Sequence, residues 1–162
     1  MNNLTELFEI QRKLDAEIEK KHPVAEGDDR LADRVLALLV EIGELANELP
    51  EVFKFWSNKK NNYEKALEEY VDGIHFLLSI GLVEGPEKLN DPPILVKNKS
   101  VRDCFLDIYE EVSEIEWSVD AYVRAFYRYV ELGEKLGFTW EQIESAYMAK
   151  NAINHQRQET GY

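Results

Sequence analysis

Apolar residues recur along this chain at the spacing of an α-helix. Leu31, Val35, Leu38, Ile42 and Leu45 follow one another at intervals of four and three residues, so they form one continuous apolar stripe on a helix. The pattern contains no two alternating segments joined by a turn, which would indicate a β-hairpin. It therefore predicts an all-α bundle of five to six helices. The predicted helices span about 4–20, 28–49, 63–82, 101–116, 118–136 and 139–155.

Several of these boundaries carry local signals. His22-Pro23 and Leu49-Pro50 end the first two helices, because the residue before a proline disfavours the helical conformation. Gly137 is a predicted C-terminal cap. Thr139-x-x-Gln142 then forms a capping box that starts the last helix.

Chain length and composition bound the class of protein. We expect residues 1–162 to form one domain with a sizeable core. Residues 85–100, which hold three prolines, are expected to form a long surface loop or insertion. The net charge of −13 argues against a polymeric nucleic acid as partner.

Targeting and cysteine signals are sparse. No run of about 18 apolar residues predicts a membrane span, and the first residues do not resemble a signal peptide. We therefore expect a cytoplasmic protein with no membrane partner. The single cysteine, Cys104, excludes an intrachain disulfide, and its apolar neighbours indicate a buried small side chain.

Two acidic pairs carry the clearest chemical signal. Glu41 and Glu44 stand three residues apart on one predicted helix, and Glu69 and Asp72 do so on the next, so each pair lies on one side of its helix. If the helices are adjacent, four carboxylates meet, and their repulsion in a poorly solvated site requires cations. Oxygen ligands of this kind favour Mg²⁺, with Mn²⁺ as a substitute. Asp72 is the more telling residue because its surroundings in the sequence are almost wholly apolar.

Some of these positions also have a purely structural interpretation. Glu41 and Glu44, together with Glu48, could form a solvated edge of a helix. His75, one turn after Asp72, could be a core histidine or could contact a ligand. Trp56 could fill the core or provide a plate on which a planar ring stacks.

A basic stripe lies near the C-terminus. Lys150, Asn154 and Arg157 recur at i, i+4 and i+7, which places them on one face of a helix. Lysine as a point charge and arginine as a planar fork suit phosphate oxygens. A basic stripe at this position also complements the helix macrodipole, so the sequence alone leaves both interpretations open.

The acidic pairs resemble a family signature. Glu41-x-x-Glu44 and Glu69-x-x-Asp72, separated by 24 residues, are similar to the ExxE…ExxD motif of the all-α nucleoside triphosphate pyrophosphohydrolases. More narrowly, the chain resembles the dimeric dUTPase branch from about Leu4 to Tyr162. The segments that support this narrower match are Phe53-Lys54-Phe55-Trp56-Ser57, Asp72-Gly73-Ile74-His75-Phe76 and Lys150-x-x-x-Asn154-x-x-Arg157-Gln158-x-x-Gly161-Tyr162.

The resemblance implies a reaction and an assembly. It implies Mg²⁺-dependent hydrolysis of dUTP to dUMP and pyrophosphate, with dUDP as a further candidate substrate. The metal would be held by both acidic pairs and would activate a water for attack at the α-phosphorus. Glu41 would orient that water, with Glu44 as the next candidate. A homodimer is also implied, and the nearly all-apolar second half of the helix predicted at 63–82 fits a bundle completed by a second copy.

The resemblance further implies substrate contacts. Gln11 would hydrogen-bond the edge of the uracil, while Trp56 and His75 would enclose its ring. Phe76 would press on the sugar and leave no room for a 2′-hydroxyl. The phosphate chain would be held by Lys150, Asn154 and Arg157.

Three rival interpretations share some of these features. A pyrophosphohydrolase for another or broader set of nucleotides, such as dCTP, would keep all four acids. A carboxylate-bridged di-iron bundle needs Glu-x-x-His on two helices, whereas this chain offers Glu19-x-x-His22 at a polar helix end and Asp72-x-x-His75. A non-catalytic helical binding protein would leave Asp72 without a role.

Overall fold

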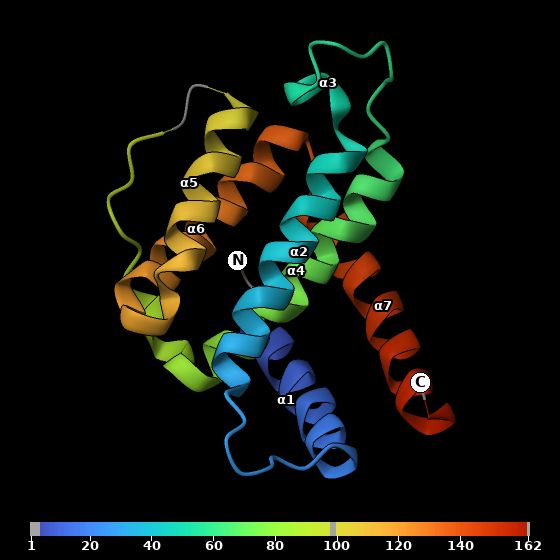
Figure 1. Cartoon of the computed structure of the whole chain (residues 1–162), viewed down its shortest axis with the longest axis vertical. Helices are drawn as coiled ribbons and strands as arrows, with labels where there is room; N and C mark the ends of the chain where they lie inside the picture. Colours follow the sequence, from blue (N-terminus) through green and yellow to red (C-terminus); the bar gives the residue numbers. More distant parts are fainter. Residues whose placement is uncertain (1–3, 98–99, 162) are drawn as a thin grey trace.

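The chain folds entirely into helices and connecting segments. The computed structural model describes residues 4–97 and 100–161. Two predictions involve residues outside these ranges: the C-terminal motif includes Tyr162, and the expectation of no signal peptide concerns the first three residues. Within these ranges there are seven α-helices, two 3₁₀ turns and no strand (Figure 1), which confirms the all-α prediction. The elements are α1 (Leu4–Lys21), α2 (Arg30–Glu48), α3 (Pro50–Phe53), α4 (Tyr63–Glu84), η1 (Pro86–Asn90), α5 (Val101–Ser113), η2 (Ile115–Trp117), α6 (Val119–Leu136) and α7 (Trp140–Thr160).

Six of the α-helices correspond to the six predicted ones, and the differences are local. The additional helix, α3, is a single turn that follows Leu49. The helix predicted to reach residue 116 ends at Ser113, and the tighter 3₁₀ turn η2 then brings Ile115 into the core. Helix α7 continues past residue 155 to Thr160, where Gly161 in the left-handed conformation ends it. The segment expected to be a loop contains the short turn η1.

Side-chain caps fix where the long helices begin. The carboxylate of Asp29 accepts from the backbone of α2, and the side chain of Asn62 does the same for α4. The predicted capping box between Thr139 and Gln142 is present. Gly137 ends α6 with a φ of 81°, as predicted, because glycine enters the left-handed region without steric cost.

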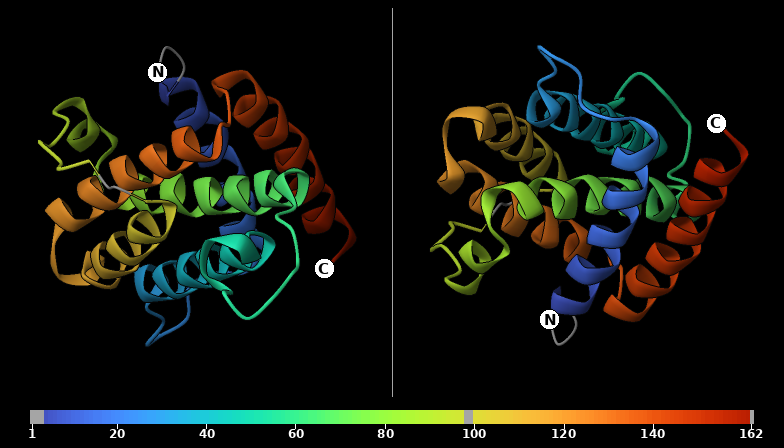
Figure 2. Two further views of the ribbon diagram at one scale, coloured as in Figure 1. Left: turned by 90° about the horizontal axis from the view of Figure 1, so that it is seen from above. Right: turned by 90° about the horizontal axis from the view of Figure 1, so that it is seen from below.

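Helix α4 is the central element of the bundle. It contacts α1, α2, α6 and α7, and Figure 2 shows it crossing the middle of the molecule with α2 on one side and α6 on the other. Residues 77–81 are all buried within the single chain, so burial of this apolar run does not itself require a second copy. No helix in the described ranges combines the length and hydropathy that crossing a membrane needs.

Close aromatic packing joins α4 to α6. The rings of Tyr70 and Tyr129 stack with centroids 4.6 Å apart, and both side chains are fully buried. The ring of Tyr129 lies directly against Gly73, where an added Cβ would come within 2.1 Å of its hydroxyl oxygen. Glycine at this position therefore allows the two helices to approach closely.

Candidate active site

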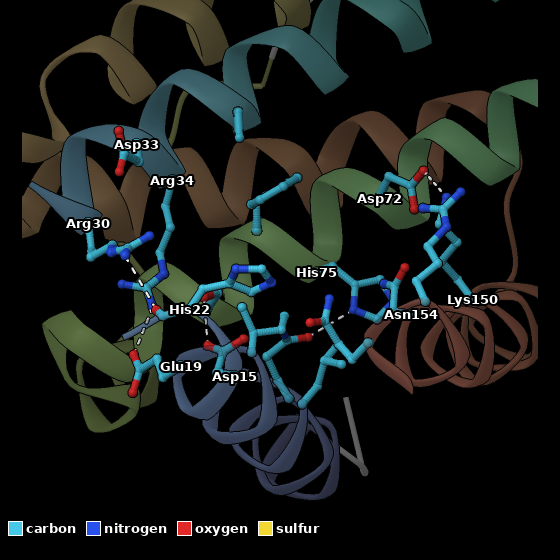
Figure 3. A pocket seen from close by; sticks show the side chains of 18 of the residues that line it. Asp15, Glu19, His22, Arg30, Asp33, Arg34, Asp72, His75, Lys150 and Asn154 are labelled. Atoms are coloured by element: carbon cyan, nitrogen blue, oxygen red, sulfur yellow. Dashed lines mark hydrogen bonds and ion pairs between the residues drawn. The ribbon is translucent and has the colours of Figure 1, made fainter. Parts of the chain in front are cut away.

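A cleft of about 470 Å³ opens between α1, α2, α4 and α7. Figure 3 shows Asp72 and Lys150 joined at one end of this cleft, with Arg34 and Glu19 toward the other. Helices from both ends of the described chain form its walls, since α1 and α7 both line the cleft and contact each other. The sequence-predicted residues that line the cleft are Gln11, Glu41, Asp72, His75, Phe76, Lys150, Asn154 and Arg157.

Three of the four predicted acids lie together. One carboxylate oxygen each from Glu41, Glu69 and Asp72 can be chosen so that all three lie within 4.8 Å of one another. Glu41 comes from α2, while Glu69 and Asp72 come from successive turns of α4. All three side chains are half-buried. A donor set made only of oxygens, at this spacing, suits a hard divalent cation.

The electrostatics of this carboxylate cluster are unfavourable for a protein without a bound cation. Burial, together with the charges of Asp72, Glu44 and Glu69, raises the pKa of Glu41 to about 7, against a lowering effect of Lys150. Burial likewise raises the pKa of Glu69. Clustered carboxylates of this kind hold protons until a cation replaces them. The residues present therefore fit a Mg²⁺ site.

Lys150 brings the nearest positive charge to the cluster. Its ammonium group donates a short hydrogen bond to Asp72 Oδ2. Burial raises the pKa of Asp72, whereas the hydrogen bond and charge of Lys150, and then the charge of Arg157, lower it. Lys150, Asn154 and Arg157 face the cleft from one side of α7, as their spacing predicted.

Glu44 lies apart from the other acids. It is exposed and does not belong to the group of oxygens within 4.8 Å. A residue three positions after Glu41 is rotated by about 60° around the helix, which turns Glu44 toward solvent. Its charge still raises the pKa values of Glu41, Glu69 and Asp72, so it lies within electrostatic reach.

Trp56 lies away from the cleft. It is 67% exposed in the segment between α3 and α4 and is absent from the residues that line the cleft. The rings of Phe53 and Phe55 contact it edge-on. Trp56 is therefore not core filling in the single chain.

Gln11 and His75 meet at the floor of the cleft. Gln11 is 3% exposed and His75 is 6% exposed, and Gln11 Oε1 lies 2.8 Å from His75 Nδ1. The imidazole also stacks on the ring of Tyr147, with centroids 4.1 Å apart. His75 is thus both well packed and part of the cleft wall, so the two interpretations of its role are compatible.

Several polar residues of the same floor are not among those predicted from the sequence. Asp15 and Ser79 line the cleft, and Tyr147 lies behind His75. A signal was present, because Asp15 follows Gln11 by four residues and Ser79 follows His75 by four. Such pairs share a helix face. At the far end of the cleft, Arg34 and Glu19 form an ion pair at 3.3 Å.

Comparison with known proteins agrees with this geometry. A family model described as dUTPase matches residues 3–162, nearly the whole chain. A search of curated proteins gave no significant match. The chain therefore belongs to the all-helical dUTPase family. It is a dUTP diphosphatase, an enzyme that hydrolyses dUTP.

Proposed function

We propose that the chain cleaves dUTP to dUMP and pyrophosphate in the cleft between α1, α2, α4 and α7, in a Mg²⁺-dependent reaction. The observation that carries this proposal is the carboxylate cluster of Glu41, Glu69 and Asp72 beside Lys150. Oxygen ligands and a neighbouring cation are what a triphosphate with a divalent metal requires. Because α1 and α7 both line the cleft, we also propose that residues 1–162 act as one catalytic domain.

The carboxylates have distinct roles in this proposal. Glu41, Glu69 and Asp72 would hold Mg²⁺, with Mn²⁺ as a substitute. The ion would neutralise phosphate charge and activate a water molecule. Glu41 orients the attacking water toward the α-phosphorus. A bond forms there to the water oxygen, whose proton passes to the Glu41 carboxylate, and the bond from the α-phosphorus to the bridging oxygen breaks to release pyrophosphate. Glu44, exposed but within electrostatic reach, is the remaining candidate ligand and water-orienting group.

The basic face of α7 serves the leaving group. Lys150, Asn154 and Arg157 line the cleft beside the acids, where they hold the phosphate chain. Negative charge grows on the departing pyrophosphate as the bond breaks, and positioned cations stabilise that charge. Phe76, also in the cleft wall, would contact the sugar and exclude a 2′-hydroxyl.

The exposed aromatic residues support a homodimer with shared sites. Phe55 is 94% exposed and Trp56 is 67% exposed, although both side chains are large and apolar. We propose that Trp56 of a second copy covers the uracil in the cleft of the first. Mixing Glu41→Gln protein with Trp56→Ala protein should then restore activity, because one site of the mixed dimer has both native residues. A monomer by light scattering, or a mixture without recovery, would contradict this assembly.

The deciding experiment is pyrophosphate release from dUTP, with dCTP, dTTP, UTP and ATP measured alongside, with Mg²⁺ and with EDTA. Turnover of dUTP that needs Mg²⁺ and is lost in Glu41→Gln is the expected result. Turnover of several nucleotides would agree with the proposed role of the carboxylates but would contradict a uracil-specific site. It would favour a broader site, such as one that accepts dCTP. Full activity in EDTA would overturn the role of the metal.

A further inference from the structure

A second cavity lies on the other side of α4 from the cleft. Its volume is about 410 Å³, and α1, α4, α6 and α7 contribute its walls. The α4 residues in it are Tyr70, Ile74 and Leu78, which recur every four residues and so share one helix face. Asp72 of the cleft precedes Ile74 by two residues, which is about half a turn around the helix. Figure 2 shows the same division, with α2 of the cleft and α6 of this cavity on opposite sides of α4.

A tight turn between α6 and α7 builds one wall of the cavity. The N–H of Gly137 donates to the carbonyl of Glu134, and the N–H of Phe138 donates to the carbonyl of Gly133, both at 3.0 Å. This pair of bonds is the Schellman motif, which ends a helix and reverses the chain. Helix α7 then begins at Trp140. The turn therefore brings the side chains of Glu134, Phe138 and Trp140 to the same cavity.

The lining of the cavity combines aromatic rings with one acid. The described lining residues include four aromatic side chains and a single charged one, which are Tyr70, Phe126, Phe138, Trp140 and Glu134. The centroids of the Tyr70 and Phe138 rings lie 5.4 Å apart, and Tyr70 also stacks on Tyr129, so this wall is held in place. The face of an aromatic ring attracts an organic cation within about 6 Å of its centroid. A carboxylate attracts the same charge, so the lining favours a cation with an apolar body.

The carboxylate of Glu134 is free to meet such a cation. Its side chain is exposed, and among the described residues it has no ion pair and no side-chain hydrogen bond. Its charge nevertheless acts on the cavity wall, because burial and then the charge of Glu134 raise the pKa of Tyr70. The cavity thus carries a negative charge that no cation of the described chain compensates.

We propose that this cavity binds a small organic ammonium ion, with its apolar body between α1, α4 and α6 and its nitrogen between Glu134 and the rings of Phe138 and Trp140. The volume of about 410 Å³ lies within the range of about 300–1,000 Å³ that is usual for small-molecule sites. The cavity shares no lining residue with the cleft among the described residues. The proposal is therefore independent of the proposed function.

Benzyltrimethylammonium is a suitable probe, because it joins an aromatic ring to an ammonium group that cannot lose its charge. Titrated into the full chain with excess Mg²⁺, which shields the acids of the cleft, it should shift the methyl resonances of Ile74, Val130 and Ile143. The shifts should saturate with a Kd below about 1 mM, and nuclear Overhauser effects should join the probe to the same methyl groups. Benzylsulfonate, with the same ring and a negative charge, should bind at least about 10-fold more weakly. Equal binding of both compounds, or contacts confined to the cleft, would overturn the proposal.

One substitution tests the charge of Glu134. Glu134→Gln keeps the shape of the side chain, and the Kd of benzyltrimethylammonium should rise about 10-fold. Glu141→Gln is the matched control, because it removes the same charge from an exposed position in the first turn of α7, outside the cavity lining. There the Kd should change by less than about twofold. An equal effect of both substitutions would indicate general attraction to an acidic protein and would reject the site.

A second substitution tests the space. Val130 is half-buried and lines the cavity, so the larger ring of Val130→Phe should fill it and abolish binding of the probe. An unchanged Kd in folded Val130→Phe would place the probe elsewhere and overturn the proposal. Thermal melts establish that the variant is folded, and the contacts to the wild-type methyl groups decide the matter if it is not. Because none of these measurements uses dUTP, failure of this site and failure of the proposed function are distinguishable.

Discussion

Tyr70 and Tyr129 bind each other reciprocally across the α4–α6 interface. The hydroxyl of Tyr70 donates to the backbone carbonyl of Tyr129, and the hydroxyl of Tyr129 donates to the backbone carbonyl of Tyr70, both at 3.1 Å. Each buried hydroxyl thus has a partner, as the interior requires. Because Glu69 and Asp72 flank Tyr70 on α4, this pair also fixes the position of the two acids relative to the rest of the bundle.

Gly73→Ala should destabilise the protein strongly. The new Cβ would meet the ring of Tyr129 at 2.1 to 3.2 Å, and this ring is held by its stack and its hydrogen bond. We expect a loss of about 2–4 kcal/mol in the free energy of unfolding, measured by urea denaturation. Gly43→Ala is the matched control, because its Cβ would meet only the hydroxyl oxygen of half-buried Tyr109 at 3.1 Å. An equal cost at both positions would contradict the role of the Tyr129 contact.

Glu41→Gln should stabilise the metal-free protein, and by more as the pH rises. The pKa of Glu41 is about 7 in the folded protein, against 4.5 as the ordinary value, so folding favours the protonated form. Between these two values the wild type loses stability with rising pH, whereas glutamine has no proton to lose. Allowing for partial exposure, the advantage of the variant should grow by about 1–2 kcal/mol from pH 4.5 to 7.

Urea denaturation in EDTA at several pH values checks this prediction. Comparing the variant with the wild type at each pH removes the opposite contribution of His75. The lowered pKa of His75 adds stability as the pH rises toward 6.5, and both proteins share it. Mg²⁺ should reverse the ranking above pH 7, because it binds the ionised cluster of the wild type. A constant difference across the pH range would show that Glu41 has an ordinary pKa.

Lys150→Gln should impair catalysis far more than folding. The change leaves Asp72 without its bonded cation and removes a positive charge from the phosphate path. We expect kcat/KM for dUTP to fall about 10²-fold, with partial recovery in Lys150→Arg. Lys135→Gln, at an exposed position on α6, is the matched control and should leave kcat/KM unchanged. Steady-state pyrophosphate release measures all three variants.

Arg128→Met should release the segment before α5. Arg128 is 8% exposed, and its guanidinium donates to the carbonyl of Val96 at 2.6 Å and to Glu131 at 2.9 Å. Losing these bonds should cost about 2–3 kcal/mol and speed proteolysis within residues 91–97. Arg124→Met, which breaks a more exposed pair with Glu111, should cost under about 1 kcal/mol. Protease resistance equal to that of the wild type would count against the Arg128 contact.

The helices and the main acids could be predicted because their signals are periodic and local. The members of an i,i+3 pair lie within about 60° of each other around a helix, so Glu69 and Asp72 can both face Glu41, but whether a pair does so depends on the orientation of its helix. Helix phase also explains the one acid that lies apart, since Glu44 turns toward solvent once Glu41 faces α4. The capping box at Thr139 is likewise a signal contained within four residues.

The remaining features depend on contacts between distant parts of the chain. Tyr147 reaches Gln11 across 136 positions, and no spacing in the sequence reports such a bond. The place of Trp56 depends on the path of the segment between α3 and α4, which has no helical period. The orientation of the Gln11 amide follows from the structure, in which Gln11 Nε2 donates to the carboxylate of Asp15.

The cleft joins the first helix to the last, and this has a consequence for synthesis. His155 pairs with Glu17, and Tyr147 bonds Gln11, so α7 completes walls that α1 began. A ribosome synthesises α7 after α1 to α6. A nascent chain that stops before residue 147 therefore carries Glu41, Glu69 and Asp72 but lacks Lys150 and the Tyr147 ring that stacks on His75. Such a fragment has the acids proposed to hold the cation but lacks the groups proposed to hold the phosphate chain, so the walls of the cleft are complete only once α7 has been made.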